Sequence, residues 1–180
     1  MALRRPGYGC SGALAHFEQA SLQQHYVLQR TSYNHPSIEK YSTGGLISFR
    51  TITVAGRDGE AVMIAAYMGM PRANCVVNHP THGGLVTEFD LNQKVFAEAF
   101  TKKPYSAIFT EHPETGAQVA GEGLEVWPEI EELSLRAHKA FPGIFAIGLD
   151  IVYTRDAYVC KFLELLRSER AEGRPLGELL

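Results

Sequence analysis

The chain has 180 residues, of which 45% are hydrophobic and 21% are charged, and this balance is typical of one globular domain with a sizeable core. Its net charge of -3 gives no reason to expect non-specific binding to nucleic acid. No stretch approaches the ~20 consecutive apolar residues of a membrane span, so no membrane partner is expected.

The cysteines, Cys10, Cys75 and Cys160, are far apart in the sequence. An odd number of cysteines without a Cys-x-x-Cys pair argues against a disulfide framework and against a structural zinc site. Free thiols are typical of a reducing compartment, and we therefore expect a cytoplasmic protein. The segment Met1–His16 carries arginines followed by glycine and proline, which is not the pattern of a signal peptide.

A glycine string of the form G-x-G-x-x-G occupies Gly7–Gly12. A dinucleotide-binding fold requires a strand before such a string, and too few residues precede it to form one. The string is interpreted either as a glycine loop of a larger architecture or as a flexible N-terminal arm. A short helix is expected over Phe17–His25 and a strand-like segment over Tyr26–Gln29.

Alternation of side chains predicts a series of antiparallel strands in the middle of the chain. The first of them, Leu46–Ala55, places the odd-numbered residues from Ile47 to Thr53 on one face and Arg50 on the other. Arg57-Asp58-Gly59 predicts a hairpin turn after it. The strands expected next are Ala61–Met70, Leu85–Leu91, Val95–Phe100 and Ala107–Thr110.

The strongest helical pattern spans Glu129–Phe141, where apolar residues recur at helical spacing. Pro128 stands at its first turn and Pro142-Gly143 ends it. Two further strands and a terminal helix are expected over Gly148–Thr154, Tyr158–Phe162 and Phe162–Glu172. This order predicts an α+β fold, an antiparallel sheet with helices packed on one face.

Three segments outside the last hairpin carry polar groups that could bind a ligand or take part in catalysis. A guanidinium in mid-strand, as at Arg50, usually reaches an anion, and both a phosphate and a carboxylate remain open. The loop Asn78–Gly84 gathers an amide, two imidazoles and a glycine pair that lets backbone N–H groups approach a ligand; an ordinary surface loop is the alternative. His112–Gly116 is interpreted as a compact turn, and its histidine and glutamate are weak catalytic candidates.

Asp150 is the strongest candidate for a functional residue, because an acid within an apolar strand needs a partner. A two-residue turn at Arg155-Asp156 places Asp150 opposite Lys161 on the following strand. The alternatives are a cross-strand ion pair with Lys161, a metal ion and a ligand. We favour the ion pair, because a lysine this close would also repel a divalent cation.

Several segments, taken in this order, resemble the ATP-grasp superfamily, in particular its sugar-transfer-associated group and the related glutamate ligases. The segments are Tyr26–Gln29, Ser48–Thr53, Val77-Asn78 with Gly83-Gly84, His112–Gly116 and Gly148–Ile151. The resemblance concerns the nucleotide-binding half of that fold and runs from Tyr26 to Cys160.

The resemblance implies a role for each matching residue, with ATP and Mg²⁺ as cofactors. Arg50 and Asn78 are implied in catalysis, Arg50 as the strand arginine that faces the phosphates, and Asp150 is implied as the first metal-binding acid. The resemblance implies nucleotide binding by residues of three segments: the adenine hinge, the loop near the reaction centre and the glycine loop over the phosphates. They are Arg5, Gly9, Gly12, Tyr26, Val27, Leu28, Gln29, Gly83 and Gly84.

Two features depart from the family pattern. The family ends its last hairpin with Glu-x-Asn, which binds magnesium, and the matching residues here are Lys161-Phe162-Leu163. The domain expected before the glycine loop is missing, so the chain is interpreted as N-terminally truncated. The expected divisions are 1–45 for the glycine loop and hinge remnant, 46–163 for an ATP-grasp-like core and 164–180 for a C-terminal helix or tail.

The expected function is nucleotide binding by an ATP-grasp-like domain, related to ATP-dependent carboxylate–amine ligases but incomplete for catalysis. Such ligases activate a carboxylate as an acyl phosphate and pass the acyl group to an amine. The alternative is a non-catalytic module, or a truncated gene product, that acts as a binding or partner domain. The expected partners are a nucleotide, a small carboxylate, and either a missing N-terminal half or a second copy of the chain.

Overall fold

A computed structural model describes residues 31–56, 59–72, 83–101 and 107–156, together with the backbone of residues 158–167. Its contacts divide the chain into two compact units, Met1–Ser32 and Tyr33–Leu180, and the elements named below belong to the second unit. Within the described part of the chain, no helix is both long enough and apolar enough to span a bilayer.

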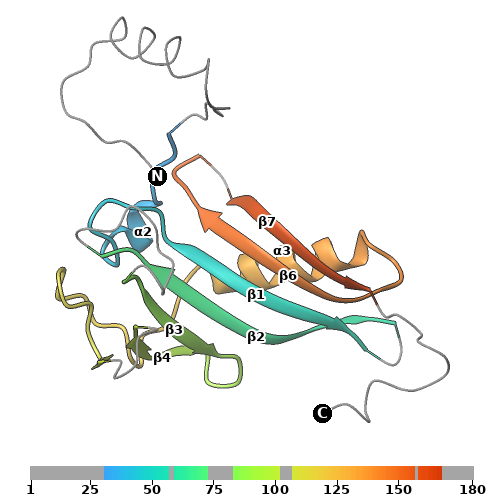
Figure 1. Ribbon diagram of the computed structural model, residues 1–180, viewed down its shortest axis with the longest axis horizontal. Helices are drawn as coiled ribbons and strands as arrows, with labels where there is room; N and C mark the ends of the chain where they lie inside the picture. Colours follow the sequence, from blue (N-terminus) through green and yellow to red (C-terminus); the bar gives the residue numbers. More distant parts are fainter. Residues whose placement is uncertain (1–30, 57–58, 73–82, 102–106, 157, 168–180) are drawn as a thin grey trace, which may run out of the picture. The chain divides into compact units, whose positions relative to one another are not determined.

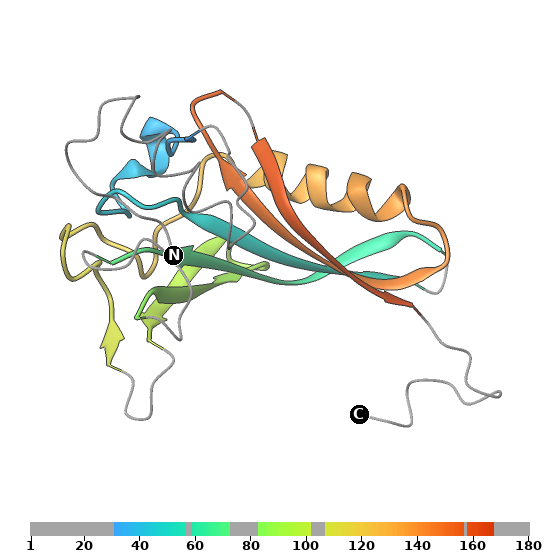
Figure 2. The ribbon, with the colours of Figure 1, turned by 45° about the horizontal axis from the view of Figure 1, so that its top comes forward.

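Strands of the second unit form a seven-stranded antiparallel sheet in the order β5-β4-β3-β2-β1-β6-β7 (Figure 1). The strands are β1 (Ser48–Ala55), β2 (Ala61–Met70), β3 (Leu85–Asp90), β4 (Val95–Phe100), β5 (Ile108–Phe109), β6 (Ile144–Tyr153) and β7 (Tyr158–Arg167). The short helix α2 (Pro36–Glu39) precedes β1, and helix α3 (Trp127–Lys139) packs against β1, β2 and β6 (Figure 2). The predicted α+β class is confirmed.

Strand β1 divides the sheet into two faces, as its alternation predicts. Phe49, Thr51 and Thr53 are buried with almost no exposed surface, while Arg50 and Ile52 between them remain partly exposed. The hydroxyl groups of Thr51 and Thr53 form hydrogen bonds with side chains of α3. We call this side the helix face, and the opposite side, which carries Arg50, the Arg50 face.

Helix α3 buries two apolar and two polar side chains, Trp127, Ile130, Ser134 and His138. Ile130 is fully buried in the core, as the apolar spacing predicts. Ser134 and His138, on the same side of the helix, are buried as well, and their side chains bond Thr51 and Thr53 at 2.8 Å each. Pairing these polar groups satisfies atoms that would otherwise be costly to bury.

Strand β7 overturns one expectation. The sequence predicts a helix over Phe162–Glu172, but the backbone continues as a strand to Arg167. Strand β6, which is longer than predicted, supplies backbone partners to β7 along this whole stretch. The Leu-rich run around Glu164 suits a helix and a buried strand equally by periodicity, and pairing with β6 decides between them.

Candidate functional site

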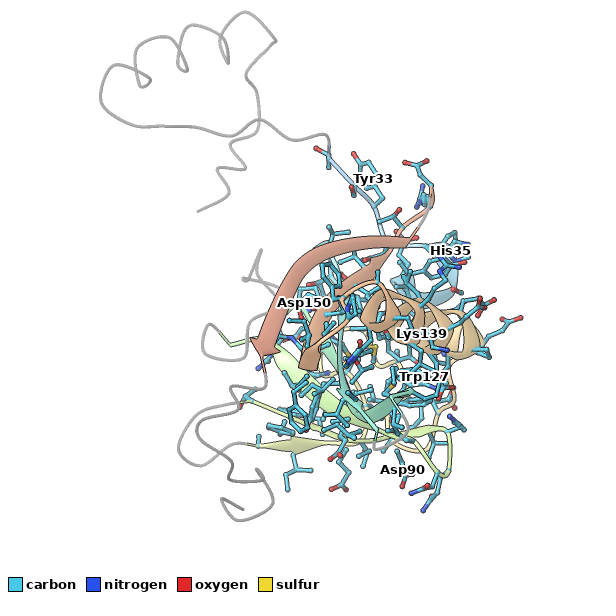
Figure 3. The ribbon with its side chains drawn as sticks, turned by 90° about the vertical axis from the view of Figure 1, so that its right-hand side faces the viewer. Tyr33, His35, Asp90, Trp127, Lys139 and Asp150 are labelled. Atoms are coloured by element: carbon cyan, nitrogen blue, oxygen red, sulfur yellow. The ribbon has the colours of Figure 1, made fainter. Side chains whose placement is uncertain are left out.

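Arg50 and Asp150, both predicted from the sequence, meet on the Arg50 face, and Figure 3 labels Asp150. They are directly opposite each other on the neighbouring strands β1 and β6. The Arg50 Nε donates to Asp150 Oδ1 at 2.5 Å, and Nη2 donates to Oδ2 at 2.9 Å. Such a two-pronged, charge-assisted contact is geometrically specific. The side chains are 38% and 26% exposed, so solvent screening limits what the pair adds to stability.

The register corrects the predicted position of Asp150 directly opposite Lys161. Near the turn the register is as predicted, with Tyr153 opposite Tyr158 and Ile151 opposite Cys160. A β-bulge follows, and it shifts the register so that Asp150 stands opposite Phe162. The bulge adds one residue, Lys161, to β7, and counting residues back from the turn could not detect it.

The Arg50–Asp150 pair belongs to a polar row that crosses four strands. The register places Glu88 of β3 opposite Tyr67 of β2, Tyr67 opposite Arg50, and Arg50 opposite Asp150. Glu88 is exposed and Tyr67 is partly exposed. On this face of β1, Arg50 lies between Ser48 and Ile52, both partly exposed.

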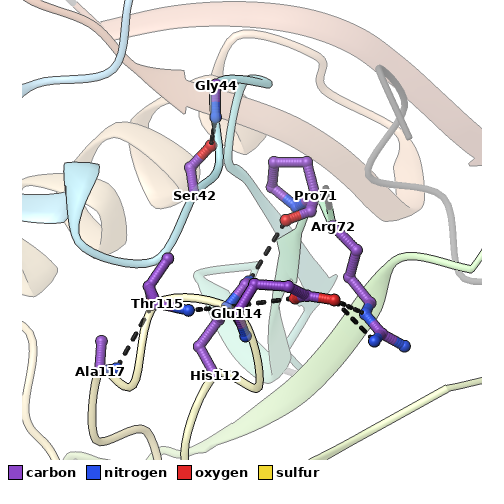
Figure 4. A network of polar contacts seen from close by, with 8 residues as sticks. All are labelled: Ser42, Gly44, Pro71, Arg72, His112, Glu114, Thr115 and Ala117. Atoms are coloured by element: carbon purple, nitrogen blue, oxygen red, sulfur yellow. Dashed lines mark hydrogen bonds and ion pairs between the residues drawn. The ribbon is translucent and has the colours of Figure 1, made fainter. Parts of the chain in front are cut away.

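The turn at His112 is structural (Figure 4). His112 is fully buried, and its Nε2 lies 3.3 Å from the carbonyl oxygen of Pro71. Because a carbonyl only accepts, Nε2 carries the proton, and Nδ1 accepts from the backbone N–H groups of Glu114 and Thr115 at 3.4 and 3.3 Å. Glu114 in turn binds Arg72 at 2.6 Å. With both ring nitrogens occupied and no exposed surface, His112 is not placed for acid–base chemistry.

Gly83 and Gly84 precede β3 at the same end of the sheet as Arg72. Gly83 has a φ of +92°, a left-handed conformation that suits glycine, and Gly84 is buried. Gly84 is four positions before Glu88, so the glycine pair lies roughly 13 Å along the strand direction from the polar row. The structure therefore brings Arg50 and Asp150 together, with the glycine pair farther along.

The other predicted site residues lie outside the described residues. They are Arg5, Gly9, Gly12, Tyr26, Val27, Leu28, Gln29 and Asn78. Their implied roles in adenine recognition, phosphate binding and catalysis stay predictions.

The described residues do not fit a magnesium site. No group of three or more His, Cys, Asp and Glu side chains is close enough to hold a metal ion in the part of the chain that the structure describes. Both carboxylate oxygens of Asp150 accept hydrogen bonds from Arg50, whose positive charge opposes a second cation. The residue opposite Asp150 on β7 is Phe162, which has no side-chain oxygen to offer.

Comparison with known protein families decides the identity. The family model described as sugar-transfer associated ATP-grasp matches residues 13–165, which is most of the chain. The chain belongs to the sugar-transfer associated ATP-grasp family. No curated protein and no solved structure matches it. The family membership confirms the resemblance found in the sequence and makes this an ATP-grasp-like nucleotide-binding domain.

The match covers both members of the central ion pair. Arg50 and Asp150 lie within residues 13–165, separated by most of the sheet and by helix α3 in sequence. Sequence reasoning found each residue but missed their pairing, because nothing local shows that β6 returns to the side of β1. The only signal available was that each residue is the charged residue at the centre of a predicted apolar strand.

Proposed function

We propose that this ATP-grasp domain binds ATP over the Arg50 face, with Arg50 contacting the phosphates, and that it does not complete the ligase reaction. The observation that carries the proposal is the Arg50–Asp150 pair between β1 and β6, in a chain of this family. Arginine suits phosphate because its planar fork presents five N–H donors. Such a fork can bind a carboxylate along one edge and a phosphate along another.

The residues on the two sides of Arg50 differ in charge. Along the row, Arg50 is flanked by the uncharged Tyr67 on β2 and by the acid Asp150 on β6, with the exposed Glu88 beyond Tyr67. A polyanion is repelled by the acids at both ends. We therefore expect the phosphates to approach Arg50 on the side of Tyr67, within hydrogen-bonding reach of its hydroxyl group.

The groups around Asp150 support the proposal that the ligase reaction is not completed. Transfer of the γ-phosphoryl group to a carboxylate depends on positioned cations that neutralise charge as it develops. The described residues do not fit the magnesium that supplies such charge in the family, so we assign no metal-assisted step to this chain. The activity that this site supports is nucleotide binding without turnover. Such binding does not require a small carboxylate substrate.

Calorimetric titration with ATP and with AMP tests the phosphate contact. Arg50→Gln should weaken ATP binding about tenfold or more, because a hydrogen bond to a charged group contributes about 1.5–3 kcal/mol, and AMP binding should change far less. Arg136→Gln is the matched control, because Arg136 lies on α3 and is 72% exposed. An unchanged ATP affinity in Arg50→Gln, with circular dichroism showing an intact fold, would refute the proposal.

Turnover is tested separately. The full chain is incubated with ATP, magnesium and a mixture of amino acids and small carboxylates, and release of ADP is followed by a coupled assay. We expect no release above the background without protein. ADP release that depends on an added carboxylate and is lost in Arg50→Gln would instead establish a working ligase.

A further inference from the structure

We infer that Asp150 is a positioning residue that holds the guanidinium of Arg50 for phosphate binding, and that it does not act as a metal ligand. This inference rests on the proposed function, because it concerns how the same site binds the phosphates. Its consequence is that ATP binding to this chain does not depend on magnesium. It departs from the role that family resemblance implies for Asp150.

The sheet fixes the geometry of the contact between Arg50 and Asp150. Arg50 and Asp150 are in direct register, and both carboxylate oxygens are used by the guanidinium, at 2.5 and 2.9 Å. Both side chains rise from interior strands, β1 between β2 and β6, and β6 between β1 and β7. Hydrogen bonding on both edges fixes the two backbones, so the orientation of the guanidinium is set before any ligand arrives.

The strand beside Asp150, β7, offers few oxygen ligands near it. Magnesium prefers several oxygen ligands in near-octahedral geometry. The bulge in β7 puts Phe162 opposite Asp150, and the acid in β7, Glu164, stands opposite Gly148, the next position on the Arg50 face. A diagonal pair of this kind has Cα atoms about 7–8 Å apart. Glu164 is thus the residue on which a metal site at this hairpin would have to rely.

Asp150 can affect ligand binding as well as folding, because it orders the side chain of Arg50. The side chains of the pair are 38% and 26% exposed, so water screens part of the attraction that the pair adds to folding stability. Fixing a long, flexible arginine, in contrast, removes the entropic cost of ordering it when a phosphate binds. The benefit therefore falls on ligand affinity more than on folding.

The test is a set of ATP titrations with excess EDTA and with excess magnesium. The proteins are the full chain and the variants Asp150→Asn, Glu164→Gln, Arg50→Gln and the double variant of Arg50 and Asp150. In the unaltered chain we expect the two dissociation constants to agree within about threefold. Asp150→Asn should weaken ATP binding about tenfold under both conditions, and Glu164→Gln should change neither value.

The double variant supplies a readout that a purely structural role would not produce. If Asp150 acts through Arg50, then Asp150→Asn has no further effect on ATP affinity once Arg50 is glutamine. Equal effects of Asp150→Asn in both backgrounds would overturn positioning through Arg50. Tighter ATP binding by Asp150→Asn would overturn it too, because Asp150 would then compete with the phosphates.

Two outcomes separate this inference from the proposed function. If magnesium tightens ATP binding tenfold or more and Glu164→Gln or Asp150→Asn abolishes that gain, Asp150 is a metal ligand and only the inference fails. If Arg50→Gln leaves ATP binding unchanged both with excess EDTA and with excess magnesium, the proposed phosphate contact fails, and the inference fails with it.

Discussion

Replacing Thr53 by valine tests how the polar layer under α3 stabilises the fold. Thr53 is fully buried, and its hydroxyl lies 2.8 Å from Nδ1 of His138, whose Nε2 lies 3.3 Å from the carbonyl oxygen of Ile144. Since that carbonyl only accepts, Nε2 donates to it, and Nδ1 accepts from the Thr53 hydroxyl, for which it is a closer partner than the Ile147 carbonyl oxygen at 3.4 Å. Thr53→Val therefore leaves a buried acceptor on His138 without its partner.

Thr51 offers a matched comparison two positions away on the same strand. It is also fully buried, and its hydroxyl lies 2.8 Å from that of Ser134. Ser134 donates to the carbonyl oxygen of Ile130 at 2.8 Å, so its own proton keeps a partner in Thr51→Val. Valine has nearly the same shape as threonine and suits a strand, so any benefit of the added methyl group is similar at both positions.

The difference in what is left behind sets the expected magnitudes. Leaving a buried polar atom unsatisfied costs about 1–3 kcal/mol, whereas a hydrogen bond whose remaining partner is still satisfied contributes about 0.5–1.5 kcal/mol. We expect Thr53→Val to lower the free energy of unfolding by about 2 kcal/mol and Thr51→Val by about half as much. For a chain of this length, about 2 kcal/mol corresponds to a decrease in Tm of about 4–8 °C.

Urea unfolding followed by circular dichroism measures both losses. The midpoints are expected to fall while the m-values stay constant, since neither substitution changes the surface exposed on unfolding. Losses that agree within about 0.3 kcal/mol, or a larger loss for Thr51→Val, would refute the reasoning from the unsatisfied ring nitrogen.

Two further expectations use the same unfolding assay. His112→Phe should lower the free energy of unfolding by about 1–3 kcal/mol, because the Pro71 carbonyl and the amides of the turn lose a buried partner. Arg72→Gln removes a partly exposed ion pair with Glu114 and should lower it by less than about 1 kcal/mol. Equal losses for the two variants would contradict this contrast. Ile130→Ala should cost about 2–5 kcal/mol, because it opens a cavity in the core, and a loss below about 1 kcal/mol would show that the core closes around it.

Much of the fold follows from local patterns in the sequence. Alternation along Leu46–Ala55 correctly separates buried Thr51 and Thr53 from Arg50, and the strand Ala61–Met70 agrees with β2 at both ends. The apolar spacing finds α3, with its bounds displaced by two residues. These signals are strong because each element has one buried face and one exposed face, which the period of the side chains reports directly.

The parts that could not be predicted depend on contacts between distant segments. Buried Ser134 and His138 look like exposed helix residues until β1 brings threonines beneath them. The hairpin turn suggests a partner for Asp150 on the following strand, whereas its partner lies on β1, since strand order is not encoded by the turn. The C-terminal strand resembles a helix in sequence because a run rich in leucine satisfies both periods.

The bulge at Lys161 shows how this sheet absorbs a change of length. Ile151 pairs with Cys160 and Asp150 with Phe162, so removing Lys161 would join two stretches that already keep a common register. An inserted residue at this point is confined to a local distortion of one strand and leaves the pairs on both sides unaltered. Strand β7 can therefore lose the residue at position 161 while the register of Asp150 with Arg50 stays the same.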